Sequence, residues 1–321
     1  MINWALLAGY VLSLIVMIGL PIFLAFVVVR RFHVSWWVVL TGVITFIGSQ
    51  VVHIPALAGV NALFSNGTLP IPPANWIPLV NGLITGLLAG LCEETARWVG
   101  FKVLRDRGKP WGSALGLGVG HGGAEAIILA VLGTGISLFT VLFYNAGHQI
   151  ASGTSMATVQ NMLQQIAAFW GQPFYTGLLP GLERIIALST QILLSILVWK
   201  AVVEHSFWWF LLAILYHTIV NAVGVFLVQN GMADYLVEGV LFLFFLLNFY
   251  LIYRFITDEE EAEEEAEDEE GEEDEEDLEE EEGEARNLEE EEEEELSEPE
   301  SSIDSPDLPG SEEPNPEEPR Q

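Results

Sequence analysis

The sequence Leu91-Cys92-Glu93-Glu94-Thr95-Ala96-Arg97 lies inside an apolar run that extends from Trp76 to Leu104. It brings two adjacent carboxylates and a guanidinium into a segment with the length and composition of a transmembrane helix. A charged side chain at the centre of a bilayer costs at least about 2.5–3.5 kcal/mol on insertion scales. We therefore expect these side chains to face the protein interior and to serve a function there.

The net charge of −33 is distributed unevenly along the 321 residues. Residues 258–321 hold 37 of the 45 acidic residues and 2 of the 12 basic ones, which leaves 8 acids and 10 bases in residues 1–257. The front part consists of several apolar runs of about 20 residues or more. This pattern predicts an all-α, polytopic membrane protein, and nothing in it indicates a nucleic-acid partner.

Seven apolar segments are long enough to cross a bilayer. They cover approximately residues 4–29, 34–57, 76–104, 111–132, 178–203, 208–228 and 235–253. Lysine and arginine residues lie at alternate ends of these segments, which predicts a cell-membrane protein with its N-terminus outside and its C-terminal tail in the cytoplasm. The pattern leaves open a further span near residues 133–150. Residues 156–169 could form an amphipathic helix on the membrane surface.

The acidic segment 258–321 differs from the rest of the chain in composition. It consists of glutamate runs followed by sequence rich in Ser, Pro and Glu. Such a segment cannot bury enough apolar area to offset chain entropy, and its like charges repel one another. We therefore predict a transmembrane bundle over residues 1–257, which carries the site, and a disordered cytoplasmic tail over residues 258–321.

Ionisable side chains from three different segments are expected at one depth in the membrane. Glu93, His121 and His217 lie about 11, 10 and 9 residues from the cytoplasmic ends of their segments, or roughly 14–17 Å at the rise of an α-helix. His121 is one helical turn from Glu125, and His217 is one turn from Asn221. The common depth predicts that these groups meet in the interior of the bundle.

A stripe of small residues leads into the Glu-Glu pair. Gly82, Gly86 and Gly90 follow one another at intervals of one helical turn. A stripe of this kind lets the backbone of a neighbouring helix approach closely. We therefore expect this face, and the carboxylates beyond it, to pack against another helix and not against lipid.

Other polar side chains in the spans have a simple supporting interpretation. Arg97 is one turn from the two glutamates and would neutralise a carboxylate, while Glu125 would fix the tautomer of His121. Two further pairs are interpreted as an interhelical hydrogen-bonding pair and a pair at a helix start: Gln50 with His53, and Glu183 with Arg184.

These residue types suit the hydrolysis of a peptide bond inside a membrane. A glutamate can take a proton from water, and a histidine on a facing helix can hold the water or shuttle the proton. His217 and Asn221 can donate hydrogen bonds to a developing oxyanion. The alternative is a zinc site formed by His121, His217 and Glu94, because two imidazoles and one carboxylate are a catalytic zinc set with an open position. The sequence lacks a His-Glu-x-x-His helix.

Three motifs together resemble the YhfC family of intramembrane metallopeptidases: Glu93-Glu94-Thr95-Ala96-Arg97, His121-Gly122-Gly123-Ala124-Glu125 and His217-Thr218-Ile219-Val220-Asn221. That family is similar to the group that contains the CAAX prenyl proteases of type II, the bacteriocin-processing CPBP proteins and the glutamate protease PrsW. The resemblance covers residues 1–257, and the pairs at Gln50–His53 and Glu183–Arg184 look like family positions too.

The resemblance implies that Glu93 or Glu94 activates water together with His121. It also implies that His217 and Asn221 act on the oxyanion side or as ligands. The CPBP pattern has three residues between the second glutamate and the arginine, whereas this sequence has two. The difference turns Arg97 by about 100° around the helix, and the spacing is closer to that of PrsW.

The expected function is thus an intramembrane peptidase that acts on a membrane-embedded protein or a lipidated peptide, with or without zinc. Two other classes stay open at this point. A proton-coupled transporter would also carry Glu and His at mid-membrane, although it would predict internal repeats, and none is convincing here. A catalytically inactive scaffold would tolerate the loss of Glu93 and Glu94.

Overall fold

The computed structural model describes residues 2–145 and 155–297 of the chain. The chain divides into two units, Met1–Glu259 and Glu260–Gln321. Within the described residues the backbone forms helices and no strand. The helices are α1 (Trp4–Arg31), α2 (Trp36–Ser65), α3 (Ile77–Leu104), α4 (Gly112–Leu129), α5 (Ile136–Asn145), α6 (Met156–Trp170), α7 (Leu179–Val203), α8 (Phe207–Gln229) and α9 (Asp234–Ser297).

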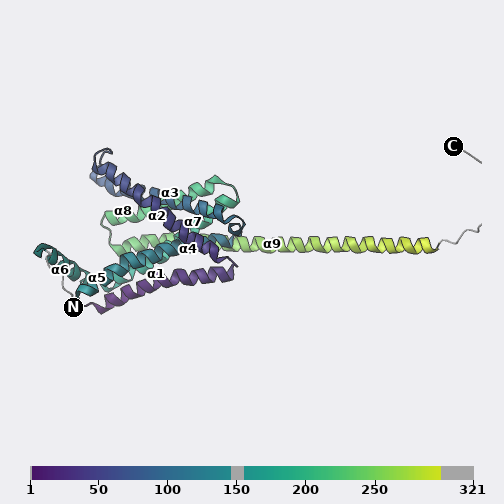
Figure 1. Ribbon diagram of the computed structural model, residues 1–321, viewed down its shortest axis with the longest axis horizontal. Coiled ribbons are helices and arrows are strands. Elements are labelled where there is room, and N and C mark those ends of the chain that lie inside the picture. The colour runs from purple at the N-terminus through teal and green to yellow at the C-terminus, as the bar shows by residue number, and fades with distance from the viewer. Residues whose placement is uncertain (1, 146–154, 298–321) are drawn as a thin grey trace, which may run out of the picture. The chain divides into compact units, whose positions relative to one another are not determined.

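Seven helical segments of the described part are long and apolar enough to cross a membrane. They correspond to α1, α2, α3, the continuous pair α4–α5, α7, α8 and the first part of α9. The prediction of an all-α polytopic membrane protein is therefore confirmed. The amphipathic segment predicted over residues 156–169 forms α6, which lies at the end of the bundle where α1 begins (Figure 1).

The region in which a further span was left open contains a helix irregularity. A π-helical turn, Ala130–Gly135, joins α4 to α5, so that the two form a single candidate span from Gly112 to Asn145. The turn contains two glycines, Gly133 and Gly135, which lower helix propensity. Among the described residues no additional span occurs here, and residues 146–154 lie outside them.

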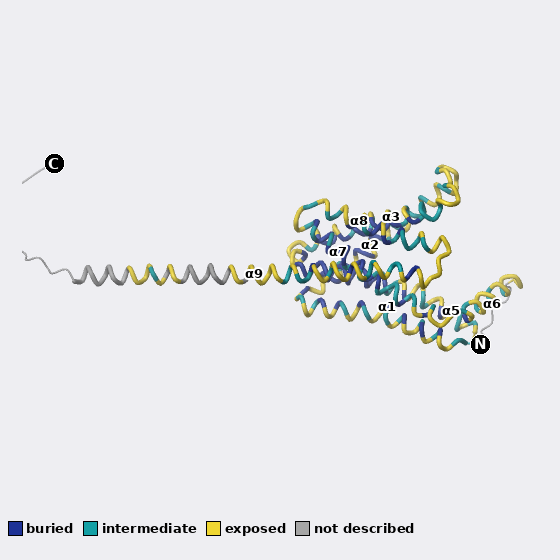
Figure 2. Tube along the Cα trace, turned by 180° about the vertical axis from the view of Figure 1, so that it is seen from behind, coloured by how far each residue is buried: buried dark blue, intermediate teal, exposed yellow. Residues whose placement is uncertain are grey.

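Helix α4 is enclosed by other helices along most of its length. Every residue from Gly112 to Ala124 is buried, and the buried part of the unit lies along the middle of the bundle (Figure 2). Glycines allow this: a Cβ atom on Gly120 would lie 2.0 Å from the carbonyl oxygen of Val39 in α2. On another side, a Cβ on Gly118 would lie 2.7 Å from the Cα of Ile192 in α7. Helix α4 can therefore hold its side chains against α2 and α7 at once.

The small-residue stripe of α3 packs against α8. Cβ atoms on Gly82 and Gly86 would lie 2.7 and 2.5 Å from the carbonyl oxygens of Ala222 and Thr218. On Gly90 the corresponding distance, to the carbonyl oxygen of Ile214, is 3.0 Å. The predicted close approach of a neighbouring helix is thus confirmed. It brings the glutamates that follow the stripe next to α8.

The acidic sequence after Thr257 continues the helical backbone of α9 as far as Ser297. The sequence predicts disorder there, and two effects oppose each other: glutamate has a high helix propensity, whereas like charges four residues apart repel one another. Residues 298–321 lie outside the described part. Disorder of the tail therefore stays a prediction.

Candidate functional site

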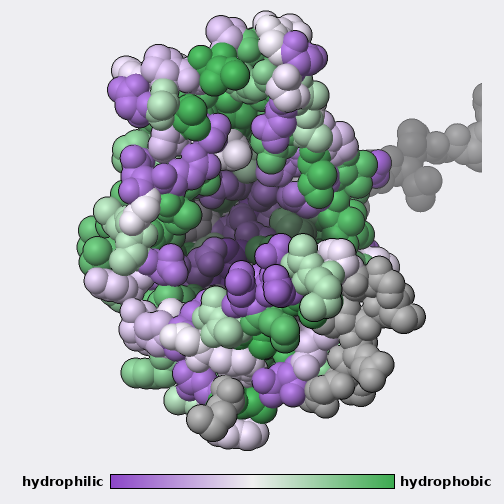
Figure 3. Space-filling model, turned by 90° about the vertical axis from the view of Figure 1, so that its left-hand side faces the viewer, coloured by the Kyte–Doolittle hydropathy of each residue, from purple (hydrophilic) through white to green (hydrophobic). Residues whose placement is uncertain are grey.

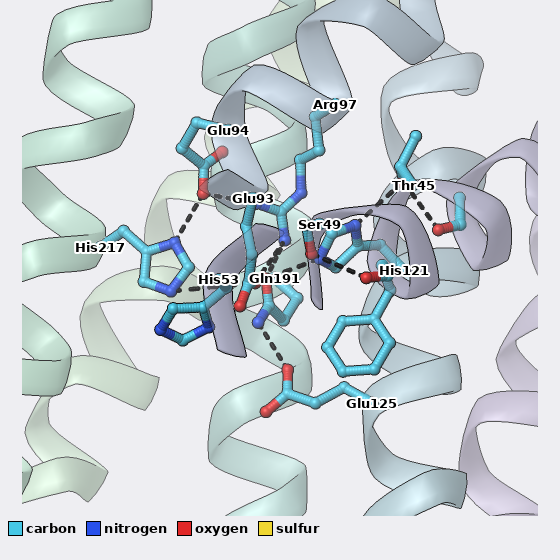
Figure 4. Close-up of polar contacts among 12 residues, drawn as sticks. Thr45, Ser49, His53, Glu93, Glu94, Arg97, His121, Glu125, Gln191 and His217 are labelled. Carbon is cyan, nitrogen blue, oxygen red and sulfur yellow. Dashed lines mark hydrogen bonds and ion pairs between the residues drawn. The ribbon is translucent and has the colours of Figure 1, made fainter. Parts of the chain in front are cut away.

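Glu93 on α3 faces His121 on α4 in the interior of the bundle (Figure 4). The Oε2 atom of Glu93 lies 3.1 Å from Nε2 of His121. The other ring nitrogen, Nδ1, lies 3.0 Å from the hydroxyl of Thr45, which itself donates to the carbonyl oxygen of Gly42. Because that hydroxyl has a single proton, it accepts from Nδ1–H of His121. In a neutral ring Nε2 is then a lone pair that faces Glu93, so a proton or a cation is needed between Nε2 and the carboxylate oxygen.

Glu94 meets His217 on the other side of α3. The Nδ1–H of His217 donates to Oε1 of Glu94 at 2.6 Å. The Nε2 atom of the same ring lies 4.0 Å from Oε2 of Glu93, too far for a direct hydrogen bond. Both histidines are thus oriented through Nδ1, and both present Nε2 toward the same carboxylate oxygen of Glu93.

Arg97 links the glutamates to α7. Its guanidinium donates to Oε1 of Glu94 and to Oε1 of Gln191, and it lies 4.0 Å from Oε2 of Glu93. The side chain is fully buried. Arg97 thus pairs with a carboxylate one turn away, the contact that the sequence predicts. The amide of Gln191 is an additional partner that sequence reasoning did not single out.

The pair Gln50 and His53 on α2 extends the site toward the end of the bundle where α2 ends. The amide nitrogen of Gln50 donates to Oε1 of Glu93 at 3.2 Å. Its carbonyl oxygen lies 3.3 Å from Nδ1 of His53 and accepts a hydrogen bond from it. The pair is therefore hydrogen-bonded to Glu93 of α3, as the interhelical hydrogen-bonding interpretation predicts.

Glu125 has a different role from the predicted one. Both ring nitrogens of His121 have other partners, so Glu125 does not fix its tautomer. One oxygen of Glu125 lies 2.7 Å from the guanidinium of Arg184, and the other accepts from the amide of Gln191 at 2.6 Å. Arg184 also pairs with Glu183. A chain of polar contacts thus connects Arg97 to Arg184 through Gln191 of α7 and Glu125 of α4.

A cavity of about 520 Å³ reaches this site from the side of Arg184. His53, His217 and Asn221 line it, together with apolar side chains of α7, α8 and α9. Figure 3 shows a hollow lined by hydrophilic residues on the face at which α1 begins. Glu93 keeps 7% of its side-chain surface exposed, whereas Glu94 keeps none. Of the two carboxylates, Glu93 is therefore the one that a water molecule can reach.

The donor chemistry of the site suits a metal ion. Among the described residues, no group of three or more His, Cys, Asp or Glu side chains is placed so that it could hold a metal ion. However, the Nε2 atoms of His121 and His217 approach one oxygen of Glu93 at 3.1 and 4.0 Å. Each of these rings also donates from Nδ1 to an oxygen, which is usual for metal-bound histidines.

The family model described as YhfC intramembrane metalloprotease matches residues 16–242, a range that contains every residue of the site. The chain belongs to the YhfC family. One curated YhfC relative, from Bacillus subtilis (strain 168), is described as an uncharacterized membrane protein and is 34% identical over 164 residues. The match covers 49% of this chain and 61% of that relative. No solved structure matches the chain.

The predicted resemblance to the YhfC family is thus confirmed, while several partners in the site were missed. Sequence reasoning did not identify Thr45, Gln191 or Glu238 as members of the polar interior. Gln191 and Glu238 could have been found, because each is a long polar side chain inside an otherwise apolar span. Thr45 gives no such signal, since threonine is common in membrane helices.

Proposed function

We propose that this protein is an intramembrane peptidase that hydrolyses a peptide bond in a membrane-embedded or membrane-associated polypeptide, lipidated peptides included. The observation that carries the proposal is the convergence of His121 and His217 on one oxygen of Glu93 beside a cavity. All of these residues lie in the unit Met1–Glu259. Family membership supports the reaction class, and the substrate is part of the proposal.

We assign the role of general base to Glu93 and a supporting role to Glu94. The Oε1 atom of Glu94 is shared by Arg97 and His217, and the side chain is fully enclosed. Glu93 keeps 7% of its side-chain surface exposed and has no ion pair shorter than 4.0 Å with Arg97. A base must reach the water that it deprotonates, and Glu93 meets that requirement.

In the proposed reaction the water oxygen attacks the carbonyl carbon of the scissile bond while Glu93 accepts the water proton. The resulting oxyanion accepts a hydrogen bond from the amide of Asn221, which lines the cavity one turn from His217. The proton on Glu93 then passes to the departing amide nitrogen, and the carbon–nitrogen bond breaks. Gln50 holds the carboxylate in position through the hydrogen bond from its amide, and His121 lies beside the other carboxylate oxygen at 3.1 Å.

A zinc ion fits the same residues. The site would hold it through Nε2 of His121 and Nε2 of His217, with Glu94 and Thr45 orienting the two rings from Nδ1, and Glu93 would stay available as the base. This set lacks the carboxylate of the predicted one, because Glu94 is already used by Arg97 and His217. When bound, zinc would polarise the carbonyl group and acidify the water.

We expect the purified full-length protein to carry about one zinc ion per chain and to cleave a transmembrane reporter in nanodiscs. His121→Ala and His217→Ala are each expected to lose the metal, measured by inductively coupled plasma mass spectrometry, because each removes one of few ligands. The exposed His205 provides a matched control as His205→Asn, which tolerates the left-handed backbone at that position. Zinc that persists in both alanine variants would refute the ligand set, and absence of both zinc and cleavage in the wild type would refute the proposed function.

We also propose the orientation that the basic residues indicate, with the N-terminus outside and the acidic tail in the cytoplasm. After Cys92→Ala, single cysteines are introduced at Ser65, an exposed residue at the end of α2, and at Ser301 in the tail. An impermeant thiol reagent added to intact cells is expected to label the first and not the second. Permeabilised cells, in which both should react, provide the control. The reverse labelling would contradict the orientation.

A further inference from the structure

We propose that Glu238 is a specificity-determining residue that pairs with a lysine or arginine side chain of the substrate polypeptide. The inference rests on the proposed peptidase function and names the class of substrate that it would take. Glu238 is on α9, outside the group formed by Glu93, Glu94, His121 and His217, and the proposed reaction does not use it.

Glu238 is a buried carboxylate without a complete set of partners. Only 8% of the residue is exposed, and Oε2 has no hydrogen-bond partner among the residues that the structure describes. Glu238 is the fifth residue of α9, whose first part is a candidate membrane span, and its burial keeps water from solvating the carboxylate freely. A buried acceptor of this kind is rare in native proteins and usually has a functional explanation.

The carboxylate borders the cavity that leads to the candidate active site. Glu238 lines the cavity of about 520 Å³ together with His217 and Asn221. It also lines a neighbouring cavity of about 640 Å³ that extends to Asp234 and Tyr235 at the start of α9. A segment that enters between α7 and α9 toward Asn221 therefore passes Glu238.

The charges around the cavity leave a negative excess at Glu238. The lining contains three carboxylates, from Glu125, Glu183 and Glu238, and a single guanidinium, from Arg184. Arg184 pairs with Glu125 at 2.7 Å and with Glu183. Its hydrogen-bonding groups are thus directed at the other two acids, whereas Glu238 forms no ion pair with the described residues and is the carboxylate of the lining that is left for an incoming cation.

The shape of the lining suits a long cationic side chain. Apolar residues such as Val228, Val237 and Leu241 lie in the same cavity wall as Glu238. The methylene groups of a lysine or arginine can pack against such a wall while the charged end reaches a carboxylate. A neutral side chain would fill the space and leave the acceptor of Glu238 unsatisfied, which lowers its affinity.

The test measures peptide binding to full-length protein in nanodiscs. The probes are a set of transmembrane peptides that carry a single lysine at successive positions, with glutamine at the same positions in the partner set. The measurement uses the Glu93→Gln background, so that the peptides are not consumed. We expect the best lysine peptide to bind at least roughly tenfold more tightly than its glutamine partner, because a desolvated charge pair forms.

The decisive variant is Glu238→Gln, which keeps the shape of the side chain. We expect the ratio of the two affinities to fall to about one in this variant. The exposed Glu204 at the opposite end of α7 provides the control, because Glu204→Gln should leave the ratio unchanged. If the glutamine variant does not fold, Glu238→Met has a similar volume and serves the same purpose.

Equal affinities for lysine and glutamine peptides at every position would overturn the inference. A lysine preference that survives both Glu238 variants would overturn it too, as would a Glu238-dependent site that binds sodium or calcium ions and not the peptides. The outcome is separable from that of the proposed function. The wild-type protein could cleave no reporter and still prefer the lysine peptide, with a preference that disappears in the Glu238 variants. That result would uphold this inference and refute the proposed peptidase function.

Discussion

Glu93→Gln is expected to reduce cleavage of a transmembrane reporter on the order of 10²–10⁴-fold, the contribution of a general base. The substitution keeps the shape of the side chain and removes its ability to accept the water proton. Glu94→Gln is expected to lower the rate only about 10–100-fold, because Glu94 acts by orienting His217 from Nδ1. Initial rates in nanodiscs, measured with both variants side by side, distinguish the two roles.

The exposed carboxylate of Glu204 offers a matched control for this pair. Glu204→Gln should retain the wild-type rate, because Glu204 lies at the end of α7 and outside the site. Melting temperatures of all three variants show whether the lost activity reflects chemistry or unfolding. Full cleavage by the Glu93→Gln/Glu94→Gln double variant would remove the proposed mechanism.

Gly86→Leu is expected to lower the free energy of unfolding by about 3 kcal/mol or more, at the upper end of the range for overpacked cores. A Cβ atom at this position would lie 2.5 Å from the carbonyl oxygen of Thr218 and 3.2 Å from its Cα. Both atoms belong to the backbone of α8, so no side-chain rotation can relieve the contact. Separation of α3 from α8 would also pull Glu94 away from His217 and reduce activity.

Gly48 provides the control for the added volume and for the loss of a glycine within a helix. A Cβ atom on Gly48, in the middle of α2, would meet no other atom within 4 Å. Gly48→Leu should therefore leave the melting temperature in detergent within a few degrees of the wild type, whereas Gly86→Leu should lower it strongly. Equal melting temperatures for the two variants would mean that the α3–α8 contact does not stabilise the bundle.

The sequence alone was sufficient for the spans and for the central members of the site. Length and hydropathy define a membrane helix because the bilayer has a fixed thickness, so all seven candidate spans could be predicted. The depth of a side chain in the membrane can be predicted in the same way. Glu93, His121 and His217 are at similar distances from the ends of their spans, and they meet in the structure. The acidic run after Thr257 is less informative, because helix propensity and charge repulsion act there in opposite directions.

Only the tertiary structure decided which polar groups pair with one another. Sequence gives the depth of a side chain and its position around its own helix, but not which helix lies beside it or how that helix is rotated. Backbone contacts through Gly120 and Gly86 set those rotations, by packing α4 on α2 and α3 on α8. For this reason Thr45, and not Glu125, orients His121. For the same reason Arg184 forms ion pairs with Glu125 and Glu183. Glu238, which lines the cavity, keeps one carboxylate oxygen without a hydrogen-bond partner among the described residues.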